Sequence, residues 1–248
     1  MDIQQYLERF NAPSSKEVSL SQLTKLQHQH LHHVPFENLD VIRKVPIYLN
    51  EQSIFNKVVR EHRGGYCYEL NGLFHMLLTE LGYDTYLVAA TVLRPNGQWA
   101  KADTHATIIA HLDQPYLVDV GFGAATPRTP IPLDESEQTD INGVYKVKQA
   151  TENSFDLIQE NKAGSRTLYR FHDSKKNLVD FHEGCIFNQV AKESTFTHHD
   201  IVSIATDIGR ITLADHTMTT VENRVQTTSE LSPEDKLHIL QTIFKIHI

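Results

Sequence analysis

A cysteine, a histidine and an aspartate could give this chain a nucleophile, a base and an acceptor that orients the base. The cysteine is Cys67, which closely follows the double glycine Gly64-Gly65. The glycines predict a sharp turn, after which apolar residues recur at helical spacing until Gly82. Cys67 is therefore predicted in the first turn of a helix. There the free N–H groups and the helix dipole favour the thiolate, which is the nucleophilic form.

The partners of this thiol are predicted on two strands. His105 lies in a predicted strand at residues 103–109, and Asp119 interrupts an apolar strand at 116–123. The two strands are close enough in sequence to pair as a hairpin, which would bring both side chains to one face. A nucleophilic cysteine needs such a base and such an acceptor. Taken singly, each residue has a simpler interpretation: a buried apolar cysteine, a core histidine or a strand-end aspartate.

Several segments together resemble the motifs of the arylamine N-acetyltransferase family. They are residues 63–67, the pair Thr104-His105, residues 118–123, the Pro-Phe-Glu-Asn-Leu segment at 35–39, the opening helix at 6–9 and, more loosely, residues 194–196 and 209–213. The resemblance covers essentially the whole chain. It implies a Cys67–His105–Asp119 triad that moves an acetyl group from acetyl-CoA to an aromatic amine or hydrazine. The implied mechanism is ping-pong, through an acetyl-Cys67 thioester.

The resemblance also implies an α+β fold around a catalytic core of the cysteine-protease or transglutaminase type. An N-terminal helical bundle at 1–83 would carry the cysteine. A central antiparallel β-barrel-like domain at 84–190 would carry the histidine and the aspartate, and residues 191–248 would form an α/β lid. The only cofactor expected is acetyl-CoA as the acyl-donor co-substrate, with no metal, and the implied role is in xenobiotic metabolism.

Weaker expectations from the resemblance concern the substrates. Phe36, Phe122 and Phe196 would line the aromatic-amine pocket, because flat rings pack against flat rings. Thr104, beside His105, would touch substrate. Two glycines, Gly121 and Gly123, would let the backbone approach coenzyme A closely. Ordinary core packing and a strand-ending turn are the alternatives for these residues.

The composition is that of an ordinary globular protein, with 40% hydrophobic and 22% charged residues among 248. The net charge of -8 argues against a general nucleic-acid binder. No apolar run approaches the ~20 residues that cross a bilayer, so no membrane association is expected, and the first residues do not resemble a signal peptide. The two cysteines form no disulfide framework, which favours the reducing cytoplasm.

Periodicity predicts the remaining elements. Helices are expected at 2–10, at 20–34 up to Pro35, at 54–59 and after Ser232, and strands at 85–93, 144–148, 154–159, 167–172, 201–205, 211–213 and 217–221. Residues 127–142, with three prolines and several acidic residues, are expected to form an exposed excursion. Arg9 and Glu37 are expected to pair beneath the triad. Residues 181–192, which include Cys185, depart from the family pattern.

Histidines are concentrated near residue 30. His28 and His32 stand four residues apart, so one helix face could hold a metal ion. No carboxylate or cysteine nearby in sequence completes a ligand set, which favours a solvated helix face.

Two other functions remain open at this stage. The order Cys, His, Asp with short separations also suits a thiol hydrolase or a transglutaminase-like enzyme, although such a protein should lack the segment at 35–39. A non-enzymatic binding module is the third possibility, and it would have an unreactive Cys67.

Overall fold

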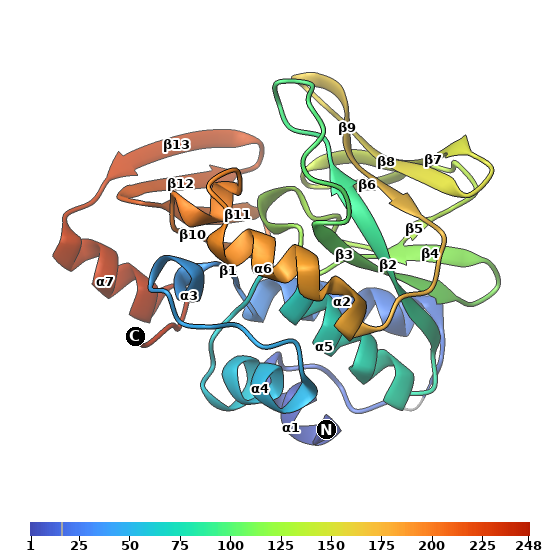
Figure 1. The fold of residues 1–248 in the computed structure, drawn as a ribbon, viewed down its shortest axis with the longest axis horizontal. Coiled ribbons are helices and arrows are strands. Elements are labelled where there is room, and N and C mark those ends of the chain that lie inside the picture. The colour runs from blue at the N-terminus through green and yellow to red at the C-terminus, as the bar shows by residue number, and fades with distance from the viewer. Residues whose placement is uncertain (16) are drawn as a thin grey trace.

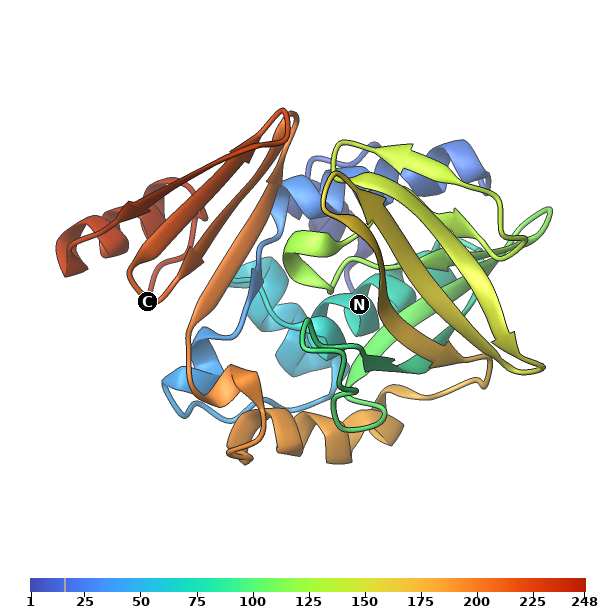
Figure 2. The same cartoon turned by 90° about the horizontal axis from the view of Figure 1, so that it is seen from above.

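The computed structural model describes residues 1–15 and 17–248, which form a group of helices, an eight-stranded sheet and a five-stranded sheet. Figure 1 shows the curved eight-stranded sheet above the helices, with the second sheet beside it. Figure 2 shows the two sheets from above as separate layers. The α+β class predicted from the sequence is confirmed.

The N-terminal helices are α1 (Ile3–Arg9), α2 (Leu20–His33), α3 (Leu39–Ile42), α4 (Glu51–Phe55) with the π-helical turn η1 (Asn56–Arg60), and α5 (Cys67–Glu80). Helices α1, α2 and α5 begin where the sequence predicts, whereas α4 begins three residues before the predicted helix at 54–59 and α3 was not predicted. The side chains of Asp2 and Ser19 cap α1 and α2 by accepting from the backbone N–H groups of Gln5 and Gln22. These caps satisfy N–H groups that have no partner inside the helix.

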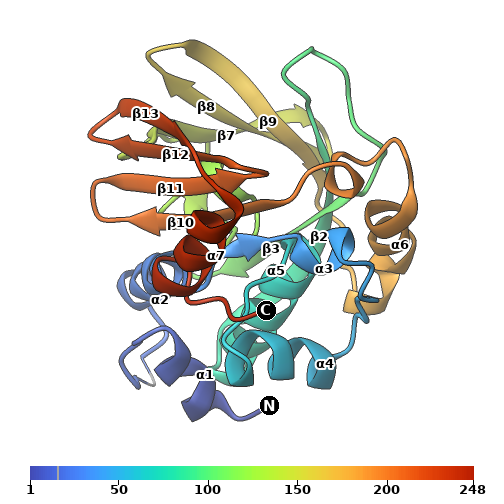
Figure 3. The same ribbon diagram turned by 90° about the vertical axis from the view of Figure 1, so that its left-hand side faces the viewer.

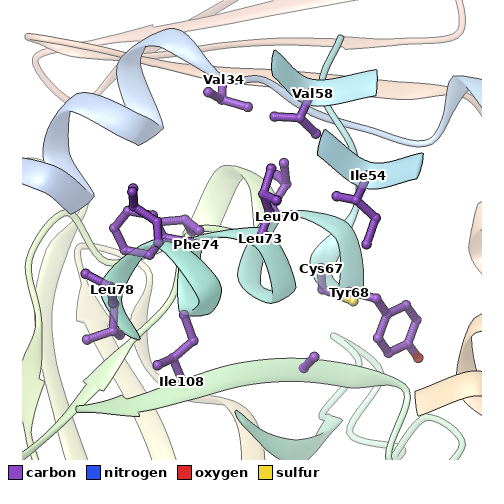
Figure 4. Close-up of a cluster of buried hydrophobic side chains, with 14 of the residues drawn as sticks. Val34, Ile54, Val58, Cys67, Tyr68, Leu70, Leu73, Phe74, Leu78 and Ile108 are labelled. Carbon is purple, nitrogen blue, oxygen red and sulfur yellow. The ribbon is translucent and has the colours of Figure 1, made fainter. Parts of the chain in front are cut away.

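Helix α5 lies in the centre of the core. Its residues Leu70, Leu73, Phe74, Leu77 and Leu78 are all fully buried. Figure 4 shows Leu70, Leu73, Phe74 and Leu78 beside side chains from other elements, among them Val34, Ile54, Val58 and Ile108. The first residue of this helix therefore has a position that the whole core fixes.

The eight-stranded sheet is antiparallel and nearly closed. Its order is β5 (Ile131–Pro132), β4 (Pro115–Val118), β3 (His105–His111), β2 (Asp84–Val92), β9 (Gly164–His172), β8 (Ser154–Asn161), β7 (Gly143–Thr151) and β6 (Gln138–Asp140). A short 3-10 turn, η2 (Gly123–Ala125), follows β4. Strand β3 packs on α5, so the barrel-like sheet is held against the helix that begins with Cys67.

The five-stranded sheet pairs one short strand from the N-terminal helical region with four strands near the C-terminal end of the chain. Its order is β1 (Phe36–Glu37), β10 (Ile201–Thr206), β11 (Gly209–Ala214), β12 (Thr217–Glu222) and β13 (Val225–Glu230). We call this sheet the lid sheet. Helix α7 (Pro233–Thr242) covers one side of it (Figure 3). Leu240 of this helix and Phe244 just after it pack in one cluster with Val202 and Leu213.

Two stretches differ from the expectation. Residues 127–142 were expected to form an exposed excursion. This is wrong for residues 127–132, because Arg128, Ile131 and Pro132 are buried and β5 pairs with β4, whereas residues 134–137 are exposed. Between residues 178 and 190 the chain forms η3 (Leu178–Phe181) and then α6 (His182–Val190), neither of which was predicted. Strand β13 was also not predicted. The division of the chain at residues 83 and 190 stays a prediction.

Every helix within residues 1–15 and 17–248 is too short or too polar to span a bilayer.

The central position of α5 makes a prediction about stability. Phe74→Ala should lower the free energy of unfolding by about 3–5 kcal/mol, because it leaves a cavity in a packed interior. Leu237→Ala on α7 is the matched control, since Leu237 is 45% exposed and its loss should cost well under half as much. Equal losses in the two variants, measured by urea unfolding, would contradict this placement of the core.

Candidate active site

The structure brings Cys67, His105 and Asp119 together in the interior. Cys67 is the first residue of α5, His105 is the first residue of β3, and Asp119 directly follows β4. Strands β3 and β4 pair antiparallel, which sets the histidine beside the aspartate. The His105 Nε2 lies 2.8 Å from Asp119 Oδ2, and the Cys67 Sγ lies 3.9 Å from the backbone carbonyl oxygen of Thr104. All three side chains are buried.

The Asp119 carboxylate accepts hydrogen bonds on both oxygens. Besides His105, its donors are the Asn71 Nδ2 at 2.8 Å, the Gly121 backbone N at 2.7 Å and the Tyr169 hydroxyl at 2.9 Å. Burial alone would raise the pKa of Asp119, but the charge and hydrogen bonding of His105, with these other donors, hold it below its ordinary value. Asp119 is therefore a carboxylate ion inside the protein.

The same contact shifts the pKa of His105 in the opposite direction, upward. Burial alone would lower the pKa of His105, yet the charge and hydrogen bond of Asp119, together with the nearby Cys67, raise it to about 10. Because Nε2 is held by Asp119, the other ring nitrogen, Nδ1, is the one left for the thiol. The arrangement favours the imidazolium form of His105.

Three residues that support the site were not predicted from the sequence. The Asn71 Oδ1 accepts from the Val120 N at 2.8 Å, while its Nδ2 also donates to the Ala106 carbonyl at 2.7 Å. Tyr169 of β9 reaches Asp119 from across the barrel, and Gln27 of α2 donates to the Asp119 backbone carbonyl. Asn71 could have been noticed in the sequence, because its amide is a polar group on the otherwise apolar helix α5. Tyr169 could not, because it resembles any buried tyrosine in a strand.

A cluster of buried charges fixes the turn that precedes Cys67. It consists of Glu37, Asp40, Lys57, Arg63 and Glu69. The Arg63 guanidinium lies 2.8 Å from Glu37 Oε1 and 2.9 Å from Asp40 Oδ1. The Lys57 Nζ lies 2.8 Å from Asp40 Oδ2 and 2.9 Å from Glu69 Oε1. Each charge therefore has an opposite partner, which burial requires.

Glu69 connects this cluster to the nucleophile helix. Its Oε2 accepts from the Tyr66 backbone N at 3.2 Å, so it caps the turn that directly precedes Cys67. Lys57 neutralises the same carboxylate. The cluster therefore orients the first turn of α5 through Glu69.

The expected pairing of Arg9 with Glu37 is wrong. Arg9 instead donates to backbone carbonyls, with Nε 2.9 Å from the Val58 O and Nη1 2.7 Å from the His33 O. Glu37 is already satisfied by Arg63 and by the backbone N of Leu39 at 2.7 Å. Arg9 therefore stabilises the ends of helical segments rather than a carboxylate.

A cavity of about 250 Å³ opens above Cys67 and His105. The four predicted substrate residues, Phe36, Thr104, Phe122 and Phe196, all line it. The Phe36 and Phe196 ring centroids are 6.1 Å apart, and the Phe122 ring stands edge-on to the His105 ring at 5.1 Å. The walls are aromatic and the floor carries the thiol, while the roles of the four residues in substrate binding stay predicted.

The local backbone structure requires glycine at positions 121 and 123, independently of any ligand. A Cβ on Gly121 would lie 2.8 Å from the Cys67 Cα, so only glycine lets this loop approach the nucleophile turn. Gly123 has a φ of +73°, and a Cβ there would meet the Phe36 ring at 3.3 Å. Contact of either glycine with coenzyme A stays a prediction.

Helix α6 forms another wall of the cavity, although the sequence did not predict it. Phe187 and Asn188 line the cavity, and the Asn188 Nδ2 donates to the Thr104 carbonyl at 3.2 Å. Cys185 points away to the Tyr66 hydroxyl, 2.8 Å from its Sγ. Burial raises the pKa of Cys185 to about 11, so it is a poor nucleophile beside Cys67.

The histidines of α2 do not complete a metal site. The His28 and His32 rings stack with centroids 4.0 Å apart. Within residues 1–15 and 17–248, no group of three or more histidine, cysteine or acidic side chains is arranged to hold a metal ion.

Comparison with known proteins identifies related chains. A family model described as N-acetyltransferase matches residues 19–248. The arylamine N-acetyltransferase of Escherichia coli strain K12 is 32% identical over 222 residues, covering 88% of this chain and 78% of its own. The structure of a Mycobacterium marinum arylamine N-acetyltransferase in complex with CoA is 28% identical and superposes with a TM-score of 0.92, covering 99% of this chain and 93% of its own. A Bacillus cereus arylamine N-acetyltransferase structure, described with a Cys-His-Glu triad, is 24% identical and superposes with a TM-score of 0.94 over 100% of both chains. At this identity the likeness concerns the fold alone.

The buried charge cluster generates a prediction about stability. Arg63→Met should lower the free energy of unfolding by about 3–5 kcal/mol, because it leaves Glu37 and Asp40 buried without their shared cation. Arg43→Met, at an exposed position of the same segment, is the matched control and should cost well under 1 kcal/mol. If urea unfolding gives the two variants the same stability, the cluster does not have the role assigned to it.

The raised pKa of His105 generates a prediction about pH. A raised pKa in the folded chain gives stability that is fully present below about pH 6.5, the unfolded value, and is lost as the pH rises toward 10. Asp119→Asn removes the carboxylate that raises this pKa and leaves only the burial that lowers it. The stability difference between wild type and Asp119→Asn should therefore be largest at mildly acidic pH and shrink toward pH 10, by about 1.4 kcal/mol for each pKa unit.

Tyr169→Phe is the control for this measurement. It removes only a hydrogen bond from an uncharged donor to the same carboxylate, so its cost should vary much less over that pH range. A pH-independent difference for Asp119→Asn would show that His105 is not charged in the folded protein.

Proposed function

Because this chain belongs to the arylamine N-acetyltransferase family, we propose that it transfers an acetyl group from acetyl-CoA to an aromatic amine or hydrazine. The observation that carries this proposal is the Cys67–His105–Asp119 arrangement at the floor of an aromatic cavity. The family match favours this function over the transglutaminase-like and binding-module alternatives. The related M. marinum structure in complex with CoA supports the choice of donor.

In the first half of the proposed reaction, Cys67 takes the acetyl group. His105 holds the proton of the thiol on Nδ1 while Asp119 holds the imidazolium in place through Nε2. The thiolate attacks the acetyl carbonyl carbon, and a new C–S bond forms. The C–S bond to coenzyme A then breaks, and the imidazolium returns its proton to the leaving thiolate.

In the second half, the acceptor amine attacks the acetyl-Cys67 thioester. The amine nitrogen forms a bond to the carbonyl carbon and gives a proton to His105, which is now neutral. The bond to the Cys67 sulfur breaks, and the thiolate–imidazolium pair is restored. One site thus serves both substrates in turn, which is the ping-pong sequence.

Both halves develop negative charge on the carbonyl oxygen. We assign its stabilisation to backbone N–H groups at the beginning of α5, which precede the first hydrogen bonds inside the helix. Glu69 and Asp119 hold this turn from two sides, so the donors need little reorganisation during the reaction.

The aromatic walls fit a flat acceptor. We propose that the acceptor ring packs among Phe36, Phe122 and Phe196 and that Thr104 borders it. We further propose that the loop of Gly121 and Gly123 faces the coenzyme, that foreign aromatic amines are the substrates, and that the protein works in the reducing cytoplasm, where Cys67 stays a thiol.

The acetyl-enzyme provides the direct test. Incubation with acetyl-CoA and no acceptor should add one acetyl group to the intact protein, and peptide mapping should find it on Cys67. Cys67→Ala should remain unmodified, whereas Cys185→Ala is the matched control and should still be acetylated, because Cys185 points away from the cavity. Acetylation of Cys67→Ala, or an unmodified wild type, would contradict the proposal.

Kinetics test the order of the steps. Varying both substrates should give parallel lines in double-reciprocal plots, since acetyl-CoA leaves as coenzyme A before the amine reacts. Intersecting lines would indicate a ternary complex and would overturn the thioester mechanism.

A further inference from the structure

The cavity above Cys67 and His105 contains a cation that the proposed reaction does not use. It is Arg94, from the loop between β2 and β3. The other lining residues within 1–15 and 17–248 are apolar or are neutral polar residues such as Asn188 and Ser194, and none of them is acidic. A guanidinium keeps its proton at every pH at which the protein is folded. The cavity therefore has a fixed positive charge on its wall.

The protein uses only part of the hydrogen-bonding capacity of this guanidinium. The Arg94 Nη2 donates to the backbone carbonyl of Glu193 at 3.2 Å, and within the described part of the chain Arg94 forms no ion pair. Lys101 of the same loop differs, because its Nζ lies 2.9 Å from Glu183 Oε1. Lys101 is thus neutralised by the protein, whereas the charge of Arg94 is left for a ligand.

The backbone around Arg94 is well fixed. The Arg94 N donates to the Gln98 carbonyl at 2.9 Å, and the Arg94 carbonyl accepts from the Gly97 N at 2.9 Å. Leu93 and Trp99 form a bridge on either side of this turn. A cation held by a fixed turn loses little conformational entropy when it binds a ligand, so it can distinguish ligands by their charge.

Arg94 lies toward the open end of the cavity. Cys67 and His105 are 3% and 2% exposed, whereas Arg94 is half-buried. In the proposed reaction the acceptor amine must reach the acetyl group on Cys67 at the closed end. The opposite end of the acceptor ring then points toward the opening that Arg94 borders.

We propose that Arg94 makes this site selective for aromatic amines that carry a carboxylate on the ring, remote from the amine. The inference rests on the proposed function and specifies its acceptor. A guanidinium donates two parallel hydrogen bonds to a carboxylate, which adds geometric selectivity to the attraction of charge. The chain as a whole has a net charge of -8 and repels anions, so a local cation is needed to admit one.

Two acceptors of nearly the same shape test this selectivity, 4-aminobenzoate and the uncharged 4-aminobenzamide. The quantity to compare is the ratio of their kcat/KM values, because the difference in intrinsic reactivity of the two amines cancels between variants. Arg94→Gln should lower this ratio about tenfold, since a charge-assisted pair of hydrogen bonds is lost for the benzoate alone. Lys101→Gln is the matched control on the same loop and should keep the wild-type ratio, because Lys101 does not line the cavity.

Salt provides a second readout of the same charge. Raising the ionic strength should lower the ratio in wild type and change it much less in Arg94→Gln, because salt screens the attraction between Arg94 and the carboxylate. An equal ratio in wild type and Arg94→Gln would overturn the proposal. Slower acetylation of Cys67 by acetyl-CoA in Arg94→Gln, with the ratio unchanged, would assign the cation to the donor and would overturn it as well.

A binding experiment separates this inference from the proposed function. Calorimetric titration of Cys67→Ala should show tighter binding of 4-aminobenzoate than of 4-aminobenzamide, and adding Arg94→Gln should remove the difference. This measurement needs no acetyl transfer. If no amine is acetylated by wild type, the proposed function fails and the binding preference alone decides the role of Arg94: equal affinities in Cys67→Ala, or no binding of 4-aminobenzoate, would then overturn it.

Discussion

The ionised carboxylate of Asp119, buried without access to water, is the constraint on which the arrangement of the site depends. Such a group is tolerated only when its oxygens are paired. Its donors come from α5, from β3, from β9 and from the loop after β4. A single carboxylate therefore connects the helical core to the barrel-like sheet, and the His105 imidazolium is the charge that balances it. The contacts that stabilise the buried Asp119 carboxylate therefore also orient the reactive His105.

The turn that leads into Cys67, which we call the nucleophile turn, is held by the buried charge cluster and by the loop that carries Asp119. Glu69 caps α5 from the cluster side, and Gly121 allows the loop of Asp119 to touch the backbone of Cys67 from the other. Substitution is poorly tolerated at both contacts. Each charge of the cluster needs its buried partner, and a Cβ at Gly121 has no room. The position of the Cys67 backbone is thus set by the buried ions and by the close approach of Gly121.

The sequence predicted what local patterns encode. Capping residues such as Asp2 and Ser232 marked the beginnings of helices. The hairpin of β3 and β4 followed from two apolar strands that lie close in sequence with a turn at residues 113–115 between them. Contacts between distant segments were not accessible in this way. Tyr169 reaches Asp119 only because the barrel curves, and Arg9 finds carbonyl groups at helix ends rather than the carboxylate of Glu37. Residues 127–142 have a polar, proline-rich composition, yet tertiary packing buries Arg128 and Ile131 within them.

The two-residue strand β1 has a consequence for how the chain acquires its structure. Phe36 pairs with Ser203 of β10 and forms a bridge to Gly65, and the backbone N of Glu37 donates to the Gly65 carbonyl at 2.9 Å. The strands β10 to β13 are joined by local turns and can associate early. Their attachment to β1 closes a loop of most of the chain, which is slow because its entropy is lost before the contact forms. During synthesis on the ribosome, the lid sheet would therefore dock last, onto a nucleophile turn whose neighbours have already emerged.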